Sequence, residues 1–449
     1  MRSNKVWSAL CAGMVVTSAA GPVAAQEVEL VVLITNVNVW DGTSDGLQNG
    51  MSVLVEGNLI SRVAANISAP SGATVIDGGG RTLMPGLMDM HTHLTLKQGI
   101  PDMMSLWDGA ATGAMAYETM QLYLRMGYTT LRDICGGSTG LARAIVAGRI
   151  SGPRLYSGGA CLAGTSSHAD WGNQNDFRGR PSAGELRDDV YIVNSPDEMR
   201  QAARQNFRNG ATVLKIFVGG GVASLFDPLE ATMLTAPEIR AAVEVAEDFG
   251  SYACMHAYQD ESINRAFDAG VRCLEHGFLM SEETVKRMKE EGRVISLQAF
   301  MSYQAFLAPE EIQGFSAENI RKARQVNAGA DQMFAWIAEH GVDAFAGTDM
   351  FTPDLIPMVT QDLVVRKRWF SDVEILKHNT SNSGRWLGMT GPKNPYKEGP
   401  LGVIQPGAYA DLILVQGDPT RDVAVLADYE ANINFVMKDG KVFKNTLGQ

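Results

Sequence analysis

An alternation of short apolar runs with helix-forming stretches, extending from about residue 84 to residue 398, constrains the fold of this chain more than any other feature. The apolar runs are predicted to be strands at residues 87–91, 129–133, 154–158, 213–218, 252–256, 272–276, 294–298 and 344–347. Between them, Ser195, Thr235 and Ser371 each begin a capping-box pattern, which marks a helix start. Eight strands alternating with helices predict an α/β fold, a (β/α)8 TIM-like barrel, with a doubly wound open sheet as the alternative.

Both ends of the chain have a different pattern, in which short alternating runs are separated by glycine-containing turns. The runs lie at residues 31–39, 51–56, 59–63, 412–415, 434–438 and 441–443. A few isolated strands cannot bury an apolar face alone. We therefore predict that residues 26–83 and 399–449 combine into one composite β-sandwich module, which flanks a catalytic barrel domain at residues 84–398.

The first 25 residues are typical of an export signal. Arg2 and Lys5 precede an apolar run, and Val23, Ala24 and Ala25 supply the small residues of a cleavage site. A membrane anchor is the alternative, but the run is shorter than the roughly 20 apolar residues that a spanning helix needs. The sequence therefore predicts a signal peptide at residues 1–25 and a periplasmic or secreted protein, free of the membrane after cleavage.

The charge balance restricts the partners. The chain has 38 Lys and Arg residues against 50 Asp and Glu residues, a formal net charge of -12 at pH 7. An acidic surface repels nucleic acids and anionic membranes, so a small-molecule substrate is the expected partner. The sequence leaves assembly into a homo-oligomer open.

Four cysteines follow the predicted signal: Cys135, Cys161, Cys254 and Cys273. An exported protein can form disulfides. Because the four are few and widely spaced, the sequence favours buried free thiols instead.

Four of the seven histidines stand at the ends of predicted strands: His91, His93, His256 and His276. Residues i and i+2 of a strand point to the same side, so His91 and His93 present two imidazoles to one space. A polar loop with incidental histidines is the alternative for this pair. The four strand-end imidazoles together favour a metal centre at the barrel mouth, because buried imidazoles need partners.

Two further strand positions fit such a centre. Asp349 follows an apolar run, and Lys215 lies inside another, where an ammonium group is costly without a counter-charge. A buried ion pair between Lys215 and Asp349 is one interpretation. The other is a lysine whose pKa is lowered by burial and whose neutral amine reacts with carbon dioxide to give an anionic carbamate.

Several motifs carry a resemblance to a known family. Residues 84–93, MPGLMDMHTH, resemble the first-strand motif of the amidohydrolase superfamily, and residues 407–413, GAYADLI, resemble its C-terminal β-module signature. Lys215 with the glycine-rich residues 219–224, residues 256–258 and residues 275–277 are similar to the imidazolonepropionase-like branch. That branch includes Xaa-Pro dipeptidases and ochratoxinase-like enzymes.

The resemblance implies two divalent metal ions, zinc being favoured and manganese or cobalt able to substitute. It implies six ligands: His91, His93, Lys215, His256, His276 and Asp349. His91 and His93 would hold the buried ion, and His256 and His276 the more exposed one. Lys215, as N6-carboxylysine, would bridge the ions, Asp349 would act as general base, and a metal-bridging hydroxide would be the nucleophile.

The resemblance also suggests substrate-binding residues: His168, Tyr258, Gly220, Gly221 and Val222. Tyr258 could donate to the substrate carbonyl, or pack as an aromatic at the barrel rim. His168 would contact substrate, although Ser166, Ser167 and Ala169 replace glycines that the family carries beside it.

Two further sequence features keep open roles. The run 219–221 could offer amides to an anion or form a flexible turn. Arg132 is interpreted as part of a structural ion pair, with a clamp for a substrate carboxylate as the alternative.

Together these features predict a binuclear metal-dependent amidohydrolase that cleaves dipeptides or N-acyl amino acids, as Xaa-Pro dipeptidases or ochratoxin-type carboxypeptidase-like enzymes do. One alternative keeps the metal centre but acts on a cyclic amide, lactone or phosphotriester. Another is a scaffold relative without catalysis, which the full set of six ligand positions disfavours.

Overall fold

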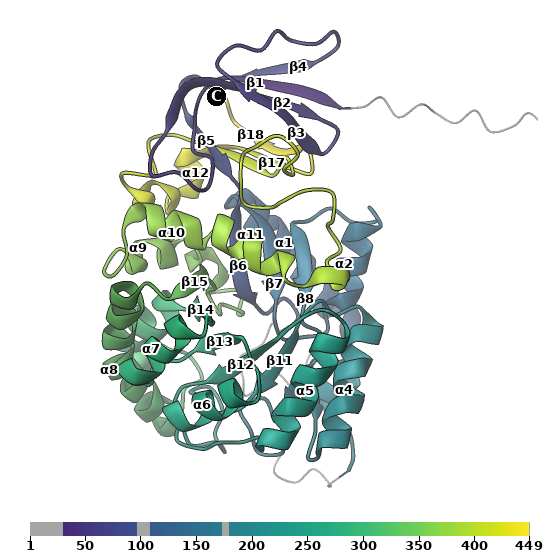
Figure 1. Cartoon of the computed structure of the whole chain (residues 1–449), viewed down its shortest axis with the longest axis vertical. Helices are drawn as coiled ribbons and strands as arrows, with labels where there is room; N and C mark the ends of the chain where they lie inside the picture. The colour runs from purple at the N-terminus through teal and green to yellow at the C-terminus, as the bar shows by residue number, and fades with distance from the viewer. Residues whose placement is uncertain (1–29, 97–107, 173–178, 449) are drawn as a thin grey trace, which may run out of the picture.

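The computed structural model describes residues 30–96, 108–172 and 179–448. A barrel surrounded by helices forms most of the molecule, and a β module built from both chain ends covers one end of it (Figure 1). The predicted barrel and β-sandwich fold is therefore confirmed. The predicted signal peptide lies outside the described residues and stays a prediction.

Eight parallel strands form the barrel, and all eight were predicted. They are β6 (Leu87–Thr92), β7 (Tyr128–Asp133), β8 (Arg154–Ser157), β11 (Leu214–Phe217), β12 (Ala253–Ala257), β13 (Cys273–His276), β14 (Val294–Leu297) and β15 (Asp343–Ala346). The Thr212 N–H donates to the Ser157 carbonyl at 2.7 Å, which connects the end of β8 to the residues just before β11. The Asp349 N–H donates to the His91 carbonyl at 2.9 Å, which connects the end of β15 to β6.

Helices cover the outside of the barrel (Figure 1). The helices that follow barrel strands or their loops are α1 (Gly109–Arg125), α2 (Thr139–Val146), α4 (Pro196–Asn209), α5 (Ala236–Asp248), α6 (Asp260–Asp268), α7 (Glu282–Glu290), α8 (Ala317–His340), α10 (Asp372–His378) and α11 (Ser381–Gly388). Shorter elements are α3 (Ala183–Leu186), α9 (Gln361–Arg366), α12 (Tyr429–Asn432) and a π-helix at Phe300–Gln304. The predicted helix starts are correct, since Ser195, Thr235 and Ser371 are the N-cap residues of α4, α5 and α10. None of the helices described has enough length and apolar character to cross a membrane.

Two short strands beside the barrel were not predicted, and neither were two strands of the β module, at Thr74–Asp77 and Thr82–Pro85. β9 (Cys161–Ala163) pairs in parallel with β11, and β10 (Val190–Ile192) pairs with β9. Each has only three residues, too few to show the alternating pattern by which a strand is recognised in a sequence.

The β module joins strands from both chain ends in one sheet with the order β18-β17-β16-β5-β1-β2-β3. The N-terminal strands are β1 (Val31–Val39), β2 (Gln48–Glu56), β3 (Leu59–Ala64), β4 (Thr74–Asp77), which pairs with β1, and β5 (Thr82–Pro85). The C-terminal strands are β16 (Leu412–Val415), β17 (Ile433–Lys438) and β18 (Lys441–Asn445). β5 pairs with β16 in antiparallel register, Met84 opposite Ile413, so the two ends share one apolar core.

The four cysteines in the described part of the chain form two disulfides, Cys135–Cys161 and Cys254–Cys273, so the prediction of free thiols is wrong. The Cα atoms are 5.0 and 4.4 Å apart, within the range that a disulfide can bridge. Cys254 and Cys273 are directly paired neighbours on β12 and β13, a proximity that spacing along the chain does not reveal.

Arg154, at the start of β8, joins the barrel to the β module. Its guanidinium donates to Asp411 at 2.7 Å and to Asp439 at 2.8 Å, and it lies 3.7 Å from the ring centroid of Tyr409. Arg154 and Asp411 are both buried. The ion pair therefore depends on both partners, because a buried charge without its counter-charge is strongly destabilising.

We expect Arg154→Ala to lower the free energy of unfolding by about 3–5 kcal/mol, because it leaves the Asp411 carboxylate buried and unpaired. Denaturant unfolding followed by circular dichroism measures this change. The control is Arg421→Ala, which removes an 87 % exposed side chain paired with Asp418 and is expected to cost no more than about 0.5 kcal/mol. Equal unfolding midpoints for the two variants would contradict the role of Arg154 as the connector.

Candidate metal centre

Four barrel strands bring the strand-end histidines and Asp349 to one place. His91 lies on β6 and His93 directly after it, while His256 is on β12 and His276 ends β13. The ring centroids of His91 and His93 are 5.1 Å apart, those of His91 and His276 are 5.1 Å apart, and those of His256 and His276 are 4.4 Å apart. The structure thus brings together the four histidines that the sequence selected.

Asp349 completes a group that could hold a metal ion. Its Oδ1 lies 3.0 Å from Nε2 of His93 and 3.4 Å from Nε2 of His91. Its Oδ2 lies 3.9 Å from Nδ1 of His276. One donor atom from each of His91, His93 and Asp349 lies within 4.8 Å of the others, which is close enough for shared coordination.

Three of the histidines have their other ring nitrogen tied to the protein. His91 Nδ1 lies 2.7 Å from Glu275, His93 Nδ1 lies 3.0 Å from the Cys135 carbonyl, and His256 Nε2 lies 3.1 Å from the Gly220 carbonyl. Metal-binding histidines are generally held in this way, because the bond fixes the tautomer and the ring orientation. The opposite nitrogen of each ring keeps its lone pair for a ligand.

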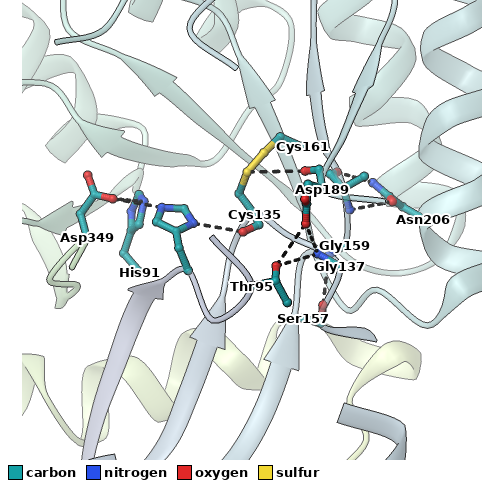
Figure 2. Close-up of a disulfide and its surroundings, with 12 residues drawn as sticks. His91, Thr95, Cys135, Gly137, Ser157, Gly159, Cys161, Asp189, Asn206 and Asp349 are labelled. Atoms are coloured by element: carbon teal, nitrogen blue, oxygen red, sulfur yellow. Dashed lines mark hydrogen bonds and ion pairs between the residues drawn. A yellow bond between two sulfur atoms is a disulfide. The ribbon is translucent and has the colours of Figure 1, made fainter. Parts of the chain in front are cut away.

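The Cys135 carbonyl is itself held in place by the surrounding loops. Cys135 is bonded to Cys161, and Asp189 connects the neighbouring segments (Figure 2). The Asp189 carboxylate accepts from the Thr95 hydroxyl at 3.3 Å and from the Gly137 N–H at 3.2 Å. Asp189 therefore joins Thr95, which follows β6, to Gly137, which follows β7, beside His93.

Burial keeps the imidazoles of His91, His256 and His276 neutral, whereas at His93 the contact with Asp349 outweighs burial and raises the pKa. Burial lowers the pKa of His91 to about 4, and the nearby Lys215 lowers it further while Asp349 and Glu275 oppose the change. It also lowers the pKa of His256 and His276 well below the usual value. A neutral imidazole has the lone pair that coordination requires, so these side chains fit a divalent transition metal.

Lys215 lies on β11 with its side chain buried. Burial lowers the pKa of Lys215 to about 8, although Glu275 and Asp349 raise it. Among the described residues no direct ion pair to Asp349 is found: the ammonium lies 5.4 Å from the Phe217 ring centroid, while the Asp349 carboxylate is shared by His91 and His93. The geometry therefore disfavours the ion-pair interpretation.

Two of the ligand candidates have unusual backbone conformations. His276 has φ 82° and Asp349 has φ 58°, in the left-handed region that favours glycine. Such a residue costs about 1–3 kcal/mol and persists only where the surrounding structure holds it. Both lie at strand ends facing the centre, where strain of this kind is typical of a functional site.

Glu275 is a site residue that the sequence analysis did not select. It joins His91 to Arg132, whose guanidinium donates to Glu275 at 2.5 Å and to the Met90 carbonyl at 2.6 Å. Burial acts to raise the pKa of Glu275, but Arg132 and His91 lower it to about 2, so the carboxylate is an anion. Arg132 therefore belongs to a structural ion pair and is no substrate clamp. The sequence does hold a signal for Glu275, because a carboxylate inside an otherwise apolar predicted strand is unusual.

Tyr258 and His168 lie against the histidine cluster. The Tyr258 ring centroid is 5.0 Å from that of His256 and 5.4 Å from that of His276, and the side chain is buried. Burial raises the pKa of Tyr258 well above the usual value, so the phenol keeps its proton. His168 stacks on His256 with ring centroids 4.4 Å apart and an interplanar angle of 16°.

The glycine run is required by close packing. A Cβ on Gly221 would lie 2.2 Å from Nδ1 of His168, and a Cβ on Gly220 would lie 2.0 Å from the Pro228 carbonyl oxygen. The Gly221 N–H donates to Asp227 at 2.7 Å, and Val222 is buried beside it. The run is therefore a packed wall of the site, which disfavours the flexible-turn interpretation.

A parallel eight-stranded barrel whose strand ends carry clustered histidines and a carboxylate has the architecture of a metal-dependent hydrolase. The chain belongs to the amidohydrolase family, whose model matches residues 82–443. The protein is accordingly an enzyme that hydrolyses amide bonds.

Similar proteins cover most of the chain. The ochratoxinase of Aspergillus niger is 28% identical over 380 residues, which are 81% of this chain and 75% of that protein. A solved structure of a prolidase complexed with N-methylphosphonate-L-proline is 28% identical with a TM-score of 0.84, covering 92% of this chain and 100% of that one. A solved Xaa-Pro dipeptidase with bound methionine is 29% identical with a TM-score of 0.80 and the same coverage.

Proposed function

We propose that this protein is a binuclear metal-dependent amidohydrolase that cleaves the amide bond of dipeptides or N-acyl amino acids. The convergence of His91, His93, His256 and His276 with Asp349 carries the proposal, because it places several imidazole nitrogens and one carboxylate around a single point. Similarity to an Xaa-Pro dipeptidase and a prolidase supports the substrate class. With the predicted signal peptide, the enzyme would be exported.

Two ions would be held by the six candidate ligands. His91, His93 and Asp349 would hold one ion, and His256 and His276 the other. Lys215 would lie between them as N6-carboxylysine: its neutral amine forms an N–C bond to carbon dioxide, one C–O π bond opens, and the amine proton leaves to solvent. Zinc suits a site with several imidazoles and carboxylate-like oxygens, and manganese or cobalt could replace it.

The bound metals would supply a water of lowered pKa and polarise the amide carbonyl. Asp349 would accept a proton from the attacking water and deliver it to the leaving amine. Burial acts to raise the pKa of Asp349, but His91 and His93 hold it well below the usual value, so the carboxylate is available as an acceptor. The protonated Tyr258 would donate to the carbonyl oxygen as negative charge develops there.

Aromatic side chains near the centre support a substrate with an apolar side chain. Phe278 packs on Tyr258 and His276, with ring centroids 5.4 and 5.6 Å away. Phe351 packs edge-on against His93 at 6.2 Å. Phe278 is buried behind the site, whereas Phe351 is partly exposed and would offer an apolar or aromatic group of the substrate a surface beside His93.

Metal analysis and a substrate screen test the proposal. Elemental analysis of the purified protein is expected to give about two transition-metal ions per chain, as two-metal hydrolases require. A screen of Xaa-Pro dipeptides, N-acyl-phenylalanine compounds and lactones is expected to give turnover of the amides above that of the lactones. A folded protein without metal, or one that hydrolyses only lactones, would contradict it.

We expect Tyr258→Phe to lower kcat by about one to three decades, the range for loss of one donor to a developing oxyanion. Steady-state kinetics on the best amide from the screen measures the loss, and elemental analysis checks that metal content is unchanged. Tyr117→Phe is the matched control, because its hydroxyl lies in an exposed contact with Ser151. An unaltered kcat for Tyr258→Phe would leave this ring with a packing role alone.

A further inference from the structure

Lys322 is a buried lysine on α8 that the proposed mechanism does not use. Its ammonium group donates to three backbone carbonyls, those of Gly221 at 3.0 Å, Ser224 at 2.9 Å and Asp227 at 2.7 Å. The side chain is 1 % exposed. An ammonium has three N–H donors, so the three carbonyls satisfy all of them and offset the cost of burying the charge.

All three carbonyls belong to residues 219–227, the segment that follows β11 and is called the glycine loop below. Two more contacts hold this loop. The Asn319 side chain, also on α8, donates to the Val222 carbonyl at 2.7 Å, and Asp227 accepts from the Gly221 N–H at 2.7 Å. One face of the glycine loop is thus attached to α8 by a lysine and an asparagine that lie one helical turn apart.

The other face of the glycine loop contacts the candidate site. His168 Nδ1 lies 2.5 Å from the Ser224 hydroxyl and 3.5 Å from the Asp227 carboxylate. The Gly220 carbonyl accepts from His256. A shift of the loop would therefore move the partners of both histidines.

Ser224 and Asp227 connect the two faces directly. The backbone carbonyl of each accepts from Lys322. The Ser224 hydroxyl and the Asp227 carboxylate both face Nδ1 of His168. The residues that Lys322 holds are therefore the residues that contact His168.

We propose that Lys322 is a positioning residue that fixes the glycine loop from α8 and thereby aims His168 at the substrate carbonyl. The inference rests on the proposed amide-hydrolysing function, since that function supplies the carbonyl. Lys322 acts through Ser224 and Asp227 and touches neither substrate nor metal ligand.

Lys322→Met keeps the length of the side chain and removes its charge and its donors. Hydrogen exchange of the full-length protein is expected to rise by at least about tenfold in peptides covering residues 219–227, because the loop loses its attachment to α8. Metal content should stay that of the parent protein. The control is Lys289→Met, which removes an exposed lysine that donates to the Gly341 carbonyl far from the glycine loop.

Kinetics give the second readout. Lys322→Met is expected to lower kcat about 10- to 100-fold, the range for residues that hold the contacting residues of a site in place. KM is expected to change by less than about threefold. In a His168→Asn background the same substitution should cost less than about threefold, because a residue that acts through His168 is not additive with its removal. Should Lys322→Met fail to fold, Lys322→Gln retains an amide with two N–H donors and is expected to show smaller changes of the same sign.

Unchanged exchange in residues 219–227 would overturn the proposal, and so would a kcat loss of equal size in both backgrounds. If the parent protein hydrolyses no amide, the proposed function fails, while the hydrogen-exchange result still decides whether Lys322 fixes the loop. The two failures are therefore distinguishable.

Discussion

Replacing Asp349 with asparagine is expected to lower kcat by about three to four decades, near the upper end of what loss of a general acid–base group costs. Asparagine has nearly the same shape, but its side chain carries no charge and no proton acceptor of useful basicity. Asp349 is also the carboxylate that faces Nε2 of both His91 and His93. The substitution therefore removes the proposed base and one candidate metal ligand together.

Steady-state kinetics on an amide substrate and elemental analysis of the same preparation separate these two effects. Asp354→Asn is the matched control, because this aspartate lies in the same segment after β15 and is exposed. Its kcat should stay within about twofold of the parent enzyme, as for surface substitutions in general. A loss of less than tenfold for Asp349→Asn would contradict its assignment as the base.

Lys215→Ala is expected to lower metal content to about one ion per chain and kcat by about three decades. The physical reason is that a bridging anion holds both ions in register, and transition-state stabilisation by metal ions is worth several kcal/mol, where about 1.4 kcal/mol is one decade in rate. Burial lowers the pKa of Lys215 to about 8, so the neutral amine that carbamate formation needs is populated near that pH.

A short carboxylate such as acetate or propionate should restore part of the metal content and activity of Lys215→Ala, since it supplies the missing anionic oxygens. Lys286→Ala, which removes an exposed lysine on α7 paired with Glu282, is the control and should behave like the parent enzyme. Native mass spectrometry checks the modification directly. Full metal content in Lys215→Ala would contradict the bridging assignment.

Much of the fold was predictable because its signals are local. The barrel strands are short stretches rich in apolar residues, and each predicted helix start depends on residues three positions apart, such as Ser195 and Glu198. The strands β9 and β10 escaped prediction because three residues do not establish a period. The pairing of Cys254 with Cys273 escaped it because adjacency of β12 and β13 does not give their register.

Some residues of the candidate site were predictable from the sequence, and others were not. His91, His93, His256, His276 and Asp349 were selected because each stands at the end of an apolar run, and parallel strands of a barrel end at one mouth. Glu275, the Cys135 carbonyl and Lys322 were not selected. They act by contacts across the fold, and Lys322 lies in an ordinary helical stretch with nothing around it in the sequence to distinguish it.

By itself the sequence determined the strand-and-helix alternation and which side chains stand at the strand ends, because both are set by neighbours along the chain. Only the tertiary structure decided which ring nitrogen of His91, His93 and His256 is hydrogen-bonded to the protein. It also decided that Arg132 pairs with Glu275 and that α8 holds the glycine loop. These are contacts between residues 36 to 184 positions apart, and their geometry depends on how the barrel closes.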